Sequence, residues 1–157
     1  MNASQYNSAL DAPAAQVDFA AAMQDPAAYS ALHSVPGPVT CIETHVSWVF
    51  LTGPFAYKVK KPLRLSFIDY STAERRFELC REELRLNRRH APGLYVDVVP
   101  ITGTPAAPRV GTTDSPPFEH ALRMAYAGNL FQHAQRARLD EPRDRRHAVR
   151  LFHAAER

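Results

Sequence analysis

Short runs of apolar and β-branched residues, separated by turn residues, follow one another from residue 39 onward. The first three runs lie at 39–42, 48–51 and 55–60, and a Thr-Gly-Pro turn at 52–54 separates the last two. Runs of this kind, bounded by Gly and Pro, are typical of strands joined by tight turns. The pattern therefore predicts a three-stranded antiparallel meander.

Beyond Pro62 the apolar positions change from strand spacing to helix spacing. Ser71, with Glu74 three residues later, predicts a capping box that opens a helix. The helix is expected to run to about His90, because Pro92 and the Gly after it break helices. Its apolar side chains fall along one side, which predicts a single packed helix.

Two further strands are predicted beyond this helix, at 95–101 and 118–124, as a second antiparallel pair. The segment between them, 102–117, is rich in Pro, Gly and Thr and is expected to be an irregular loop. Helical character then returns at 130–138 and from about residue 140 to the last residue.

The predicted order is β-β-β-α-β-β followed by helices, which is the plan of the small lobe of a protein kinase. The expected fold class is therefore α+β: a protein-kinase-like small lobe with a five-stranded antiparallel sheet and one packed helix, followed by helices that begin a large lobe. Residues 1–37 are interpreted as a frayed, partly helical or disordered lead-in. Residues 38–126 form the nucleotide-binding small lobe, and 127–157 start a helical large lobe.

Composition and charge change this picture little. The 157 residues, 45% of them hydrophobic, suffice for one domain with a core, and a net charge of +3 decides nothing about partners. Cys41 and Cys80 are far apart and lack metal-ligand spacing, which indicates reduced thiols in a cytoplasmic protein. No signal-like segment and no apolar run of about 20 residues occurs, so we expect a soluble protein without a membrane partner.

The third predicted strand carries a candidate phosphate-binding lysine. A period of two places Ala56 and Lys58 on one face, as in the kinase V-A-I-K strand, where the small residue lies under adenine and the lysine reaches the phosphates. Lys60 shares that face and is the second choice, whereas Lys61 points away and is expected to be a surface charge. The alternative is that a lysine-rich strand is merely a protected edge strand.

A kinase holds this lysine with a glutamate from the next helix. At 100° per residue, Glu83 falls within the apolar arc of the predicted helix, which makes it the candidate partner of Lys58. The alternative is that Glu83 is a boundary residue paired with Arg76 or Asn87. Two other glutamates of this helix fall on its polar face: Glu78 and Glu82.

Two further segments complete the predicted nucleotide site. Loop 43–47 occupies the place of a phosphate-covering loop, where main-chain N–H groups and the hydroxyls of Thr44 and Ser47 would contact phosphate oxygens. It lacks the glycines of such loops and is equally typical of an ordinary hairpin. Residues 121–125 would form a hinge at which Met124 either lines an adenine pocket or belongs to the core.

Several of these segments also resemble bacterial proteins of the aminoglycoside phosphotransferase family. The resemblance lies in IETHVSWVFL at 42–51, AYKVKKP at 56–62, EELRLNRR at 82–89 and VVPI at 98–101. The most similar subgroup is bifunctional, with a kinase-like domain that precedes a P-loop ATP-binding domain. The resemblance covers roughly residues 27–153, and its motifs follow one another in the family's order.

The resemblance implies a protein-kinase-like fold, ATP with Mg²⁺ as phosphoryl donor and a small-molecule hydroxyl as acceptor. In the family, an H-G-D loop and a later Mg²⁺-binding Asp carry the catalysis, and neither occurs before Arg157, nor does a P-loop. We therefore expect a truncated member with negligible kinase activity alone, with Mg²⁺ held only together with the large lobe.

Two rival functions remain open at this stage. A noncatalytic scaffold would bind a nucleotide or a partner chain, and an exposed apolar underside would favour a homodimer or assembly with a separately encoded remainder of the kinase. A nucleic-acid-binding module is suggested by the arginines of the predicted helix, but interleaved glutamates at i,i+4 spacing disfavour it. These arginines are Arg75, Arg76, Arg81, Arg85, Arg88 and Arg89. A metal site is disfavoured, because the seven histidines are scattered.

Overall fold

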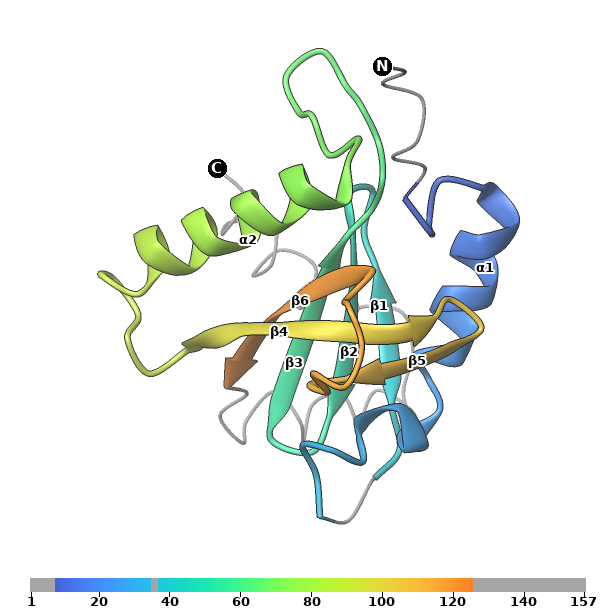
Figure 1. Ribbon diagram of the computed structural model, residues 1–157. Coiled ribbons are helices and arrows are strands. Elements are labelled where there is room, and N and C mark those ends of the chain that lie inside the picture. The colour runs from blue at the N-terminus through green and yellow to red at the C-terminus, as the bar shows by residue number, and fades with distance from the viewer. Residues whose placement is uncertain (1–7, 35–36, 126–157) are drawn as a thin grey trace, which may run out of the picture.

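The computed structural model describes residues 8–34 and 37–125. The helices predicted at 130–138 and from 140 onward, and with them the predicted start of a large lobe, lie outside the described residues. The described part is α+β, with an antiparallel sheet of six strands and helices packed on both of its faces (Figure 1).

All neighbouring strands of the sheet are antiparallel, and their spatial order is β1-β2-β3-β6-β4-β5. The predicted meander, β1 to β3, and the predicted second pair, β4 with β6, are confirmed. Strand β6 also pairs with β3 and joins the two halves of the sheet. The strands are β1 (Thr40–Glu43), β2 (Ser47–Thr52), β3 (Phe55–Lys60), β4 (Tyr95–Thr104), β5 (Ala107–Val110) and β6 (Glu119–Ala125).

The prediction of five strands is wrong, because segment 102–117 contains a hairpin. Strand β4 continues through Gly103 to Thr104, and β5 returns along it. Gly103 has φ 84°, and a Cβ on it would lie 2.4 Å from the carbonyl oxygen of Ala107, so this position favours glycine for both reasons. Pro108 is tolerated in β5 because β5 is an edge strand.

Residues 8–34, before the sheet, are partly helical and pack on the sheet. They contain α1 (Pro13–Ala22) and the 3₁₀ turn η1 (Pro26–Tyr29), and four of their large apolar side chains are fully buried. The Phe19 ring meets Trp48 and Phe50 edge to face, with centroids 5.5 and 6.2 Å apart. The buried anchors are Leu10, Phe19, Met23 and Tyr29.

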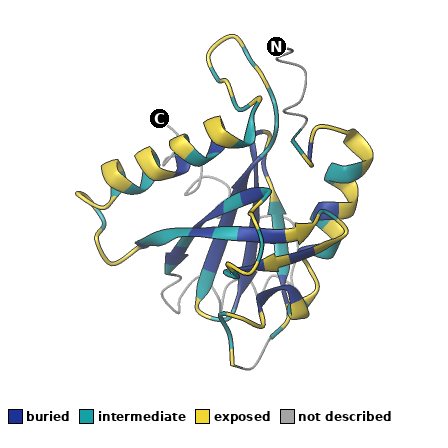
Figure 2. Ribbon diagram, viewed as in Figure 1, coloured by how far each residue is buried: buried dark blue, intermediate teal, exposed yellow. Residues whose placement is uncertain are grey.

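Helix α2 (Ala73–Asn87) covers the other face of the sheet. Its N-cap is Thr72, whose hydroxyl accepts a hydrogen bond from the Arg75 N–H at 3.1 Å, so the prediction of Ser71 as the cap is wrong. Ser71 instead binds Asp69 through its N–H and hydroxyl. Figure 2 shows that the outward side of α2 is exposed while the strands beneath it are buried.

The two faces of the sheet carry different cores. One side is aromatic and packs against α1 and η1, with Trp48, Phe50 and Tyr57 at its centre. The other side is aliphatic and packs against α2 through Leu84. The second cluster consists of Val49, Leu51, Ala56, Tyr95, Leu122 and Met124.

A buried ion pair ties the start of α2 to the sheet and to the N-terminal segment. Arg76 Nε lies 2.8 Å from a carboxylate oxygen of Glu119 in β6, with both side chains almost fully buried. The same guanidinium donates hydrogen bonds to the carbonyl of Tyr70 and to the hydroxyl of Ser8, each at 2.7 Å. A charged side chain satisfied in this way fixes four segments relative to one another.

The buried anchors predict that the N-terminal segment belongs to the cooperative fold. Phe19→Ala should lower the free energy of unfolding by about 3–5 kcal/mol, because it removes a buried aromatic side chain and leaves a cavity. Urea unfolding followed by circular dichroism measures this. Val17→Ala, two positions earlier and 70% exposed, is the control and should leave stability nearly unchanged. Equal stability of the two variants would show that α1 contributes nothing to the fold.

Candidate functional site

Strand β3 presents its lysines toward α2. Because side chains alternate along a strand, Ala56, Lys58 and Lys60 share one face, while Tyr57 and Val59 enter the aromatic core on the other. Lys58 and Lys60 are only 2% and 3% exposed. Since β3 is paired on both sides, by β2 and by β6, it is not an edge strand, and that alternative explanation of the lysines is excluded.

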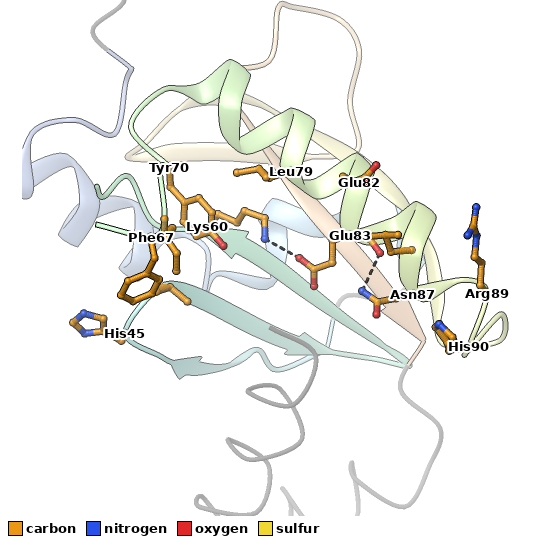
Figure 3. Close-up of a pocket in the computed structure, with 13 residues that line it drawn as sticks. His45, Lys60, Phe67, Tyr70, Leu79, Glu82, Glu83, Asn87, Arg89 and His90 are labelled. Atoms are coloured by element: carbon orange, nitrogen blue, oxygen red, sulfur yellow. Dashed lines mark hydrogen bonds and ion pairs between the residues drawn. The ribbon is translucent and has the colours of Figure 1, made fainter. Parts of the chain in front are cut away.

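Glu83 of α2 meets both lysines. Its Oε1 lies 3.1 Å from Lys58 Nζ and its Oε2 lies 2.7 Å from Lys60 Nζ, and the Glu83 side chain is 11% exposed. Figure 3 shows the Lys60 and Glu83 side chains pointing toward one another across the gap between β3 and α2. The structure thus brings together the pair that strand and helix periodicity predict, with Lys60 as an additional partner.

Neither Arg76 nor Asn87, the alternative partners predicted for Glu83, pairs with its carboxylate. Arg76 pairs with Glu119 instead, and Asn87 donates its side-chain N–H to the main-chain oxygen of Glu83 at 2.9 Å. Glu78 and Glu82 lie on the solvent side of α2, with side chains 66% and 48% exposed, as predicted.

The electrostatics of this cluster favour the charged forms of Glu83 and Lys60. Burial alone would raise the pKa of Glu83, but the ammonium groups of Lys58 and Lys60 outweigh it, so the pKa lies below its usual value. Burial would lower the pKa of Lys60, but Glu83 above all raises it. Burial raises the pKa of the neighbouring Cys80 thiol to about 12 and that of Cys41 to about 11, so neither thiol is an activated nucleophile.

The β1–β2 turn forms a tight loop at one end of the site. The Thr44 hydroxyl accepts a hydrogen bond from the Ser47 N–H at 3.0 Å and donates to the Ser47 carbonyl at 3.2 Å, and both side chains are buried. This hydroxyl serves the turn itself, and contact of Thr44 and Ser47 with a phosphate stays a prediction. The exposed side chain of the turn is His45.

Lys61, expected as a plain surface charge, braces this turn. Its Nζ donates to the Thr44 carbonyl at 2.7 Å and lies 2.6 Å from a Glu43 carboxylate oxygen, with the side chain 16% exposed. It also lies 5.5 Å from the centroid of the Trp48 ring. Sequence reasoning missed this role because the contacts depend on how the turn folds back over the end of β3.

The residues predicted to face adenine lie side by side. Ala56 and Met124 are direct partners in the β3–β6 ladder, on the face that carries Lys58. Both are buried, at 1% and 4% exposure, within the aliphatic cluster. Their immediate role in the structure is therefore in the core, and contact with a base stays a prediction.

An open pocket of about 750 Å³ adjoins the Lys60–Glu83 pair (Figure 3). Its lining comes from the β1–β2 turn, the end of β3, the connection between β3 and α2, α2 itself and the residues just after it. The sequence analysis named Lys60 and Glu83 but missed most of the lining, because it comes from segments far apart in the sequence. His45 lies in the predicted loop 43–47, while the missed lining includes Phe67, Tyr70, Leu79, Arg89 and His90.

The arginines of α2 are largely engaged within the protein. Arg75 pairs with Glu78 at 3.2 Å and Arg85 with Glu82 at 2.6 Å, so the predicted ion pairs form, but at i,i+3 and not at the predicted i,i+4 spacing. Arg76 is buried on Glu119, and Arg88 donates to main-chain carbonyls at the start of β4. Four of the six arginines named in the sequence analysis, Arg75, Arg76, Arg85 and Arg88, are thus engaged within the protein.

Within residues 8–34 and 37–125, no group of three or more His, Cys, Asp or Glu side chains is arranged to hold a metal ion. Over the same ranges, no helix has the length and apolar character needed to cross a membrane.

Comparisons with known proteins give a partial match. A 60-residue stretch, 38% of this chain, is 40% identical to proteins Mb2027c of Mycobacterium bovis and Rv2004c and MT2060 of Mycobacterium tuberculosis. The stretch covers 12% of the length of each relative, and their names state no activity. No family model and no solved structure matches the chain. The similarity is therefore to a short part of longer mycobacterial proteins.

The buried cluster of Lys58, Lys60 and Glu83 predicts that removing the charge of Glu83 lowers the stability of the fold. Glu83→Gln should lower the free energy of unfolding by about 3 kcal/mol at neutral pH, because it leaves two buried ammonium groups without their carboxylate. Glu82→Gln is the matched control one position earlier and should leave stability unchanged, since Glu82 is exposed. Urea unfolding of both variants measures the difference.

The difference in unfolding free energy between wild type and Glu83→Gln should depend on pH. A carboxyl whose pKa is lower in the folded than in the unfolded protein stabilises the fold above its unfolded pKa, and this contribution disappears as pH falls through the folded pKa. The stability gap between wild type and Glu83→Gln should therefore be full at neutral pH and shrink as the pH drops below 4.5, the ordinary value for Glu. A gap that stays constant into acid would contradict a charged Glu83.

Proposed function

We propose that this chain binds the phosphates of ATP at Lys58 and Lys60 and forms the nucleotide-binding part of an ATP-dependent small-molecule phosphotransferase. The proposed type is the aminoglycoside phosphotransferase family with its protein-kinase-like small lobe. The observation that carries the proposal is the buried contact of Glu83, on the helix after the third strand, with Lys58 in the centre of that strand.

The chemistry of this contact fits a phosphate site better than a purely structural role. An apolar residue pair of similar volume would hold a helix on a sheet at a lower desolvation cost than two buried lysines and a glutamate. Lysine is a common ligand for phosphates, and the glutamate keeps its ammonium group charged and oriented. The arrangement is therefore expected where an anion must be bound at the inner face of the sheet.

The neighbouring apolar side chains indicate how the proposed nucleotide would be oriented in the site. Ala56 lies two residues before Lys58 on the same face, which corresponds to about 7 Å along the strand. With its phosphates at Lys58, a nucleotide would lay its base along Ala56 and Met124. Both side chains are buried, so binding of a base there requires the aliphatic cluster to open.

The proposal assigns only part of the phosphotransfer chemistry to the described residues. Lysines neutralise the charge that develops on a transferred phosphoryl group, while a base and carboxylate ligands for Mg²⁺ are also needed. The described residues hold no cluster of metal ligands. We therefore assign the Mg²⁺ ligands and the phosphoryl acceptor site to other parts of the protein.

ATP binding tests the proposal directly. Isothermal titration calorimetry should detect ATP binding to the wild-type chain, and Lys58→Met should weaken it about tenfold or more, because a hydrogen bond to a charged group is lost. Arg109→Gln also removes one positive charge, but from an exposed pair with Asp114 on the edge strand β5, and should bind as the wild type does.

Circular dichroism of each variant ensures that loss of binding is not loss of folding. No measurable ATP binding by the folded wild type, or equal affinity in wild type and Lys58→Met, would refute the proposed function.

A noncatalytic scaffold is the second candidate, and the rim of the pocket favours it. Phe67 is 80% exposed and Leu86 44% exposed, and both line the pocket. Neighbouring exposed apolar side chains favour association with another chain. Size-exclusion chromatography with and without ATP separates the two functions, because a scaffold for a protein partner or a homodimer would associate without nucleotide.

A further inference from the structure

The β1–β2 turn is closed by a side-chain hydroxyl. The Thr44 hydroxyl, and not the Thr44 carbonyl, accepts the hydrogen bond from the Ser47 N–H, at 3.0 Å. The Thr44 N–H donates in turn to the Ser47 carbonyl at 2.9 Å. Because the hydroxyl takes the place of the main-chain acceptor, the Thr44 carbonyl is available to a partner outside the turn.

Lys61 is that partner, and it contacts both sides of the turn. Its Nζ donates to the Thr44 carbonyl at 2.7 Å and lies 2.6 Å from a Glu43 carboxylate oxygen. Its main-chain N–H donates to the Val46 carbonyl at 2.8 Å. Glycine-rich loops keep many backbone conformations accessible, whereas segment 43–47 has no glycine and is braced by these bonds. The turn therefore has a fixed shape.

Two consecutive main-chain N–H groups remain at the tip of this turn. Within the described part of the chain, no group accepts a hydrogen bond from the N–H of His45 or of Val46. Both residues line the pocket, and the His45 side chain is exposed. Consecutive N–H groups in a turn commonly bind anions, and an imidazole adds at least one N–H donor in any protonation state. The tip thus offers several donors to an anion.

The strand register places this tip beyond the lysines as seen from the predicted base position. In the β2–β3 ladder Ser47 faces Lys60, so the turn follows just after this pair. From Ala56 to Lys60 the strand advances by about 13 Å. A nucleotide with its base along Ala56 and its inner phosphates at Lys58 therefore extends its terminal phosphate toward the turn.

The contact between Lys58 and Glu83 is kept in this arrangement. An ammonium group has three donors, so a lysine can bind a phosphate oxygen and a carboxylate at the same time. Lys58 and Lys60 bring two positive charges to this wall and Glu83 brings one negative charge. The excess positive charge favours an anion that runs along the strand to the turn.

We propose that the tip of the β1–β2 turn is the subsite for the terminal phosphate of a nucleoside triphosphate, with His45 as its specificity-determining residue and Lys61 as its positioning residue. The imidazole and main-chain N–H of His45 and the N–H of Val46 donate to the terminal phosphate, while Lys58 binds the inner phosphates. That the ligand is a nucleotide rests on the proposed function. The consequence is a preference for ATP over ADP that depends on His45.

Isothermal titration calorimetry with ATP and with ADP tests the role of His45. His45→Ala removes the imidazole, so its affinity for ATP should fall about tenfold, because one hydrogen bond to a charged group is lost. Its affinity for ADP should equal that of the wild type, since ADP does not extend to the turn. An unchanged ratio of the two affinities in His45→Ala would overturn the assignment.

His90→Ala is the matched control. His90 is also exposed and also lines the pocket, and Figure 3 shows it at the opposite end from His45. This variant should bind both nucleotides as the wild type does. His45→Gln returns a side-chain N–H donor and should recover most of the lost ATP affinity. An equal loss of ATP affinity in His45→Ala and His90→Ala would refute a subsite at the turn.

The amide signals of the wild-type chain give a test that needs no variant. Saturation with ATP should shift the proton and nitrogen-15 signals of His45 and Val46, because their N–H groups gain a phosphate acceptor. Saturation with ADP should leave both signals nearly in place. Equal shifts with ATP and with ADP would contradict the proposal.

Lys61→Met tests the positioning role. Without nucleotide, the heteronuclear NOE of residues 44–47 should fall, because the Thr44 carbonyl loses its ammonium partner and the turn gains motion on the picosecond-to-nanosecond timescale. The ratio of ATP affinity to ADP affinity should fall as well, whereas a merely structural role would lower both affinities in parallel. An unchanged NOE, or a parallel loss of both affinities, would overturn the role of Lys61.

The terminal-phosphate subsite and the proposed function fail in different ways. If the folded wild type binds neither ATP nor ADP, the nucleotide-binding function falls, and the subsite falls with it. If both nucleotides bind and Lys58→Met weakens them, but His45→Ala keeps the wild-type ratio of affinities, only the subsite falls and the nucleotide site stands.

Discussion

A buried carboxylate shared by two lysines is one of the two charged contacts that hold helix α2 on the sheet. Apolar packing of Leu84 against the aliphatic cluster favours burial but has little directional preference. The Glu83 oxygens, in contrast, must each reach an ammonium group on β3, because an unpaired buried charge is too costly. This requirement fixes which side of α2 faces β3 at the position of Glu83.

One face of the sheet provides hydrophobic stabilisation, and the other carries the charged residues of the candidate site. On the aromatic face, rings of Phe19, Trp48 and Tyr57 pack with α1 and η1, and this burial provides much of the hydrophobic stabilisation. On the opposite face, buried lysines and a glutamate replace apolar side chains, at a cost in desolvation. The first face offsets the cost of the second, which is why the N-terminal segment matters to a site it does not touch.

Periodicity predicted the regular parts of this arrangement. Alternation along β3 placed Ala56, Lys58 and Lys60 together, and the helical period singled out Glu83, because both elements are regular in the structure. The edge strand β5 was missed because its Pro and Gly neighbours are typical of loops, yet an edge strand tolerates them. The cap of α2 was displaced by one residue because Ser71 and Thr72 are both good N-caps.

Other features were beyond sequence patterns for a different reason. The alanine-rich composition of residues 8–34 conceals that a few large side chains all reach the sheet. The pocket joins segments that are far apart in the sequence, and the contacts of Lys61 depend on the folded turn, so no local pattern encodes either feature. Long-range geometry of this kind follows from the packed fold and not from the spacing of residue types.

Arg76 and Glu83 lie seven residues apart, about two turns, and therefore on nearly the same side of α2. Arg76 is locked to β6 and to Ser8 at one end, and Glu83 to β3 at the other. A helix held at two points along one side cannot rotate about its own axis. These two contacts therefore determine which side chains of α2 face the sheet and which face solvent.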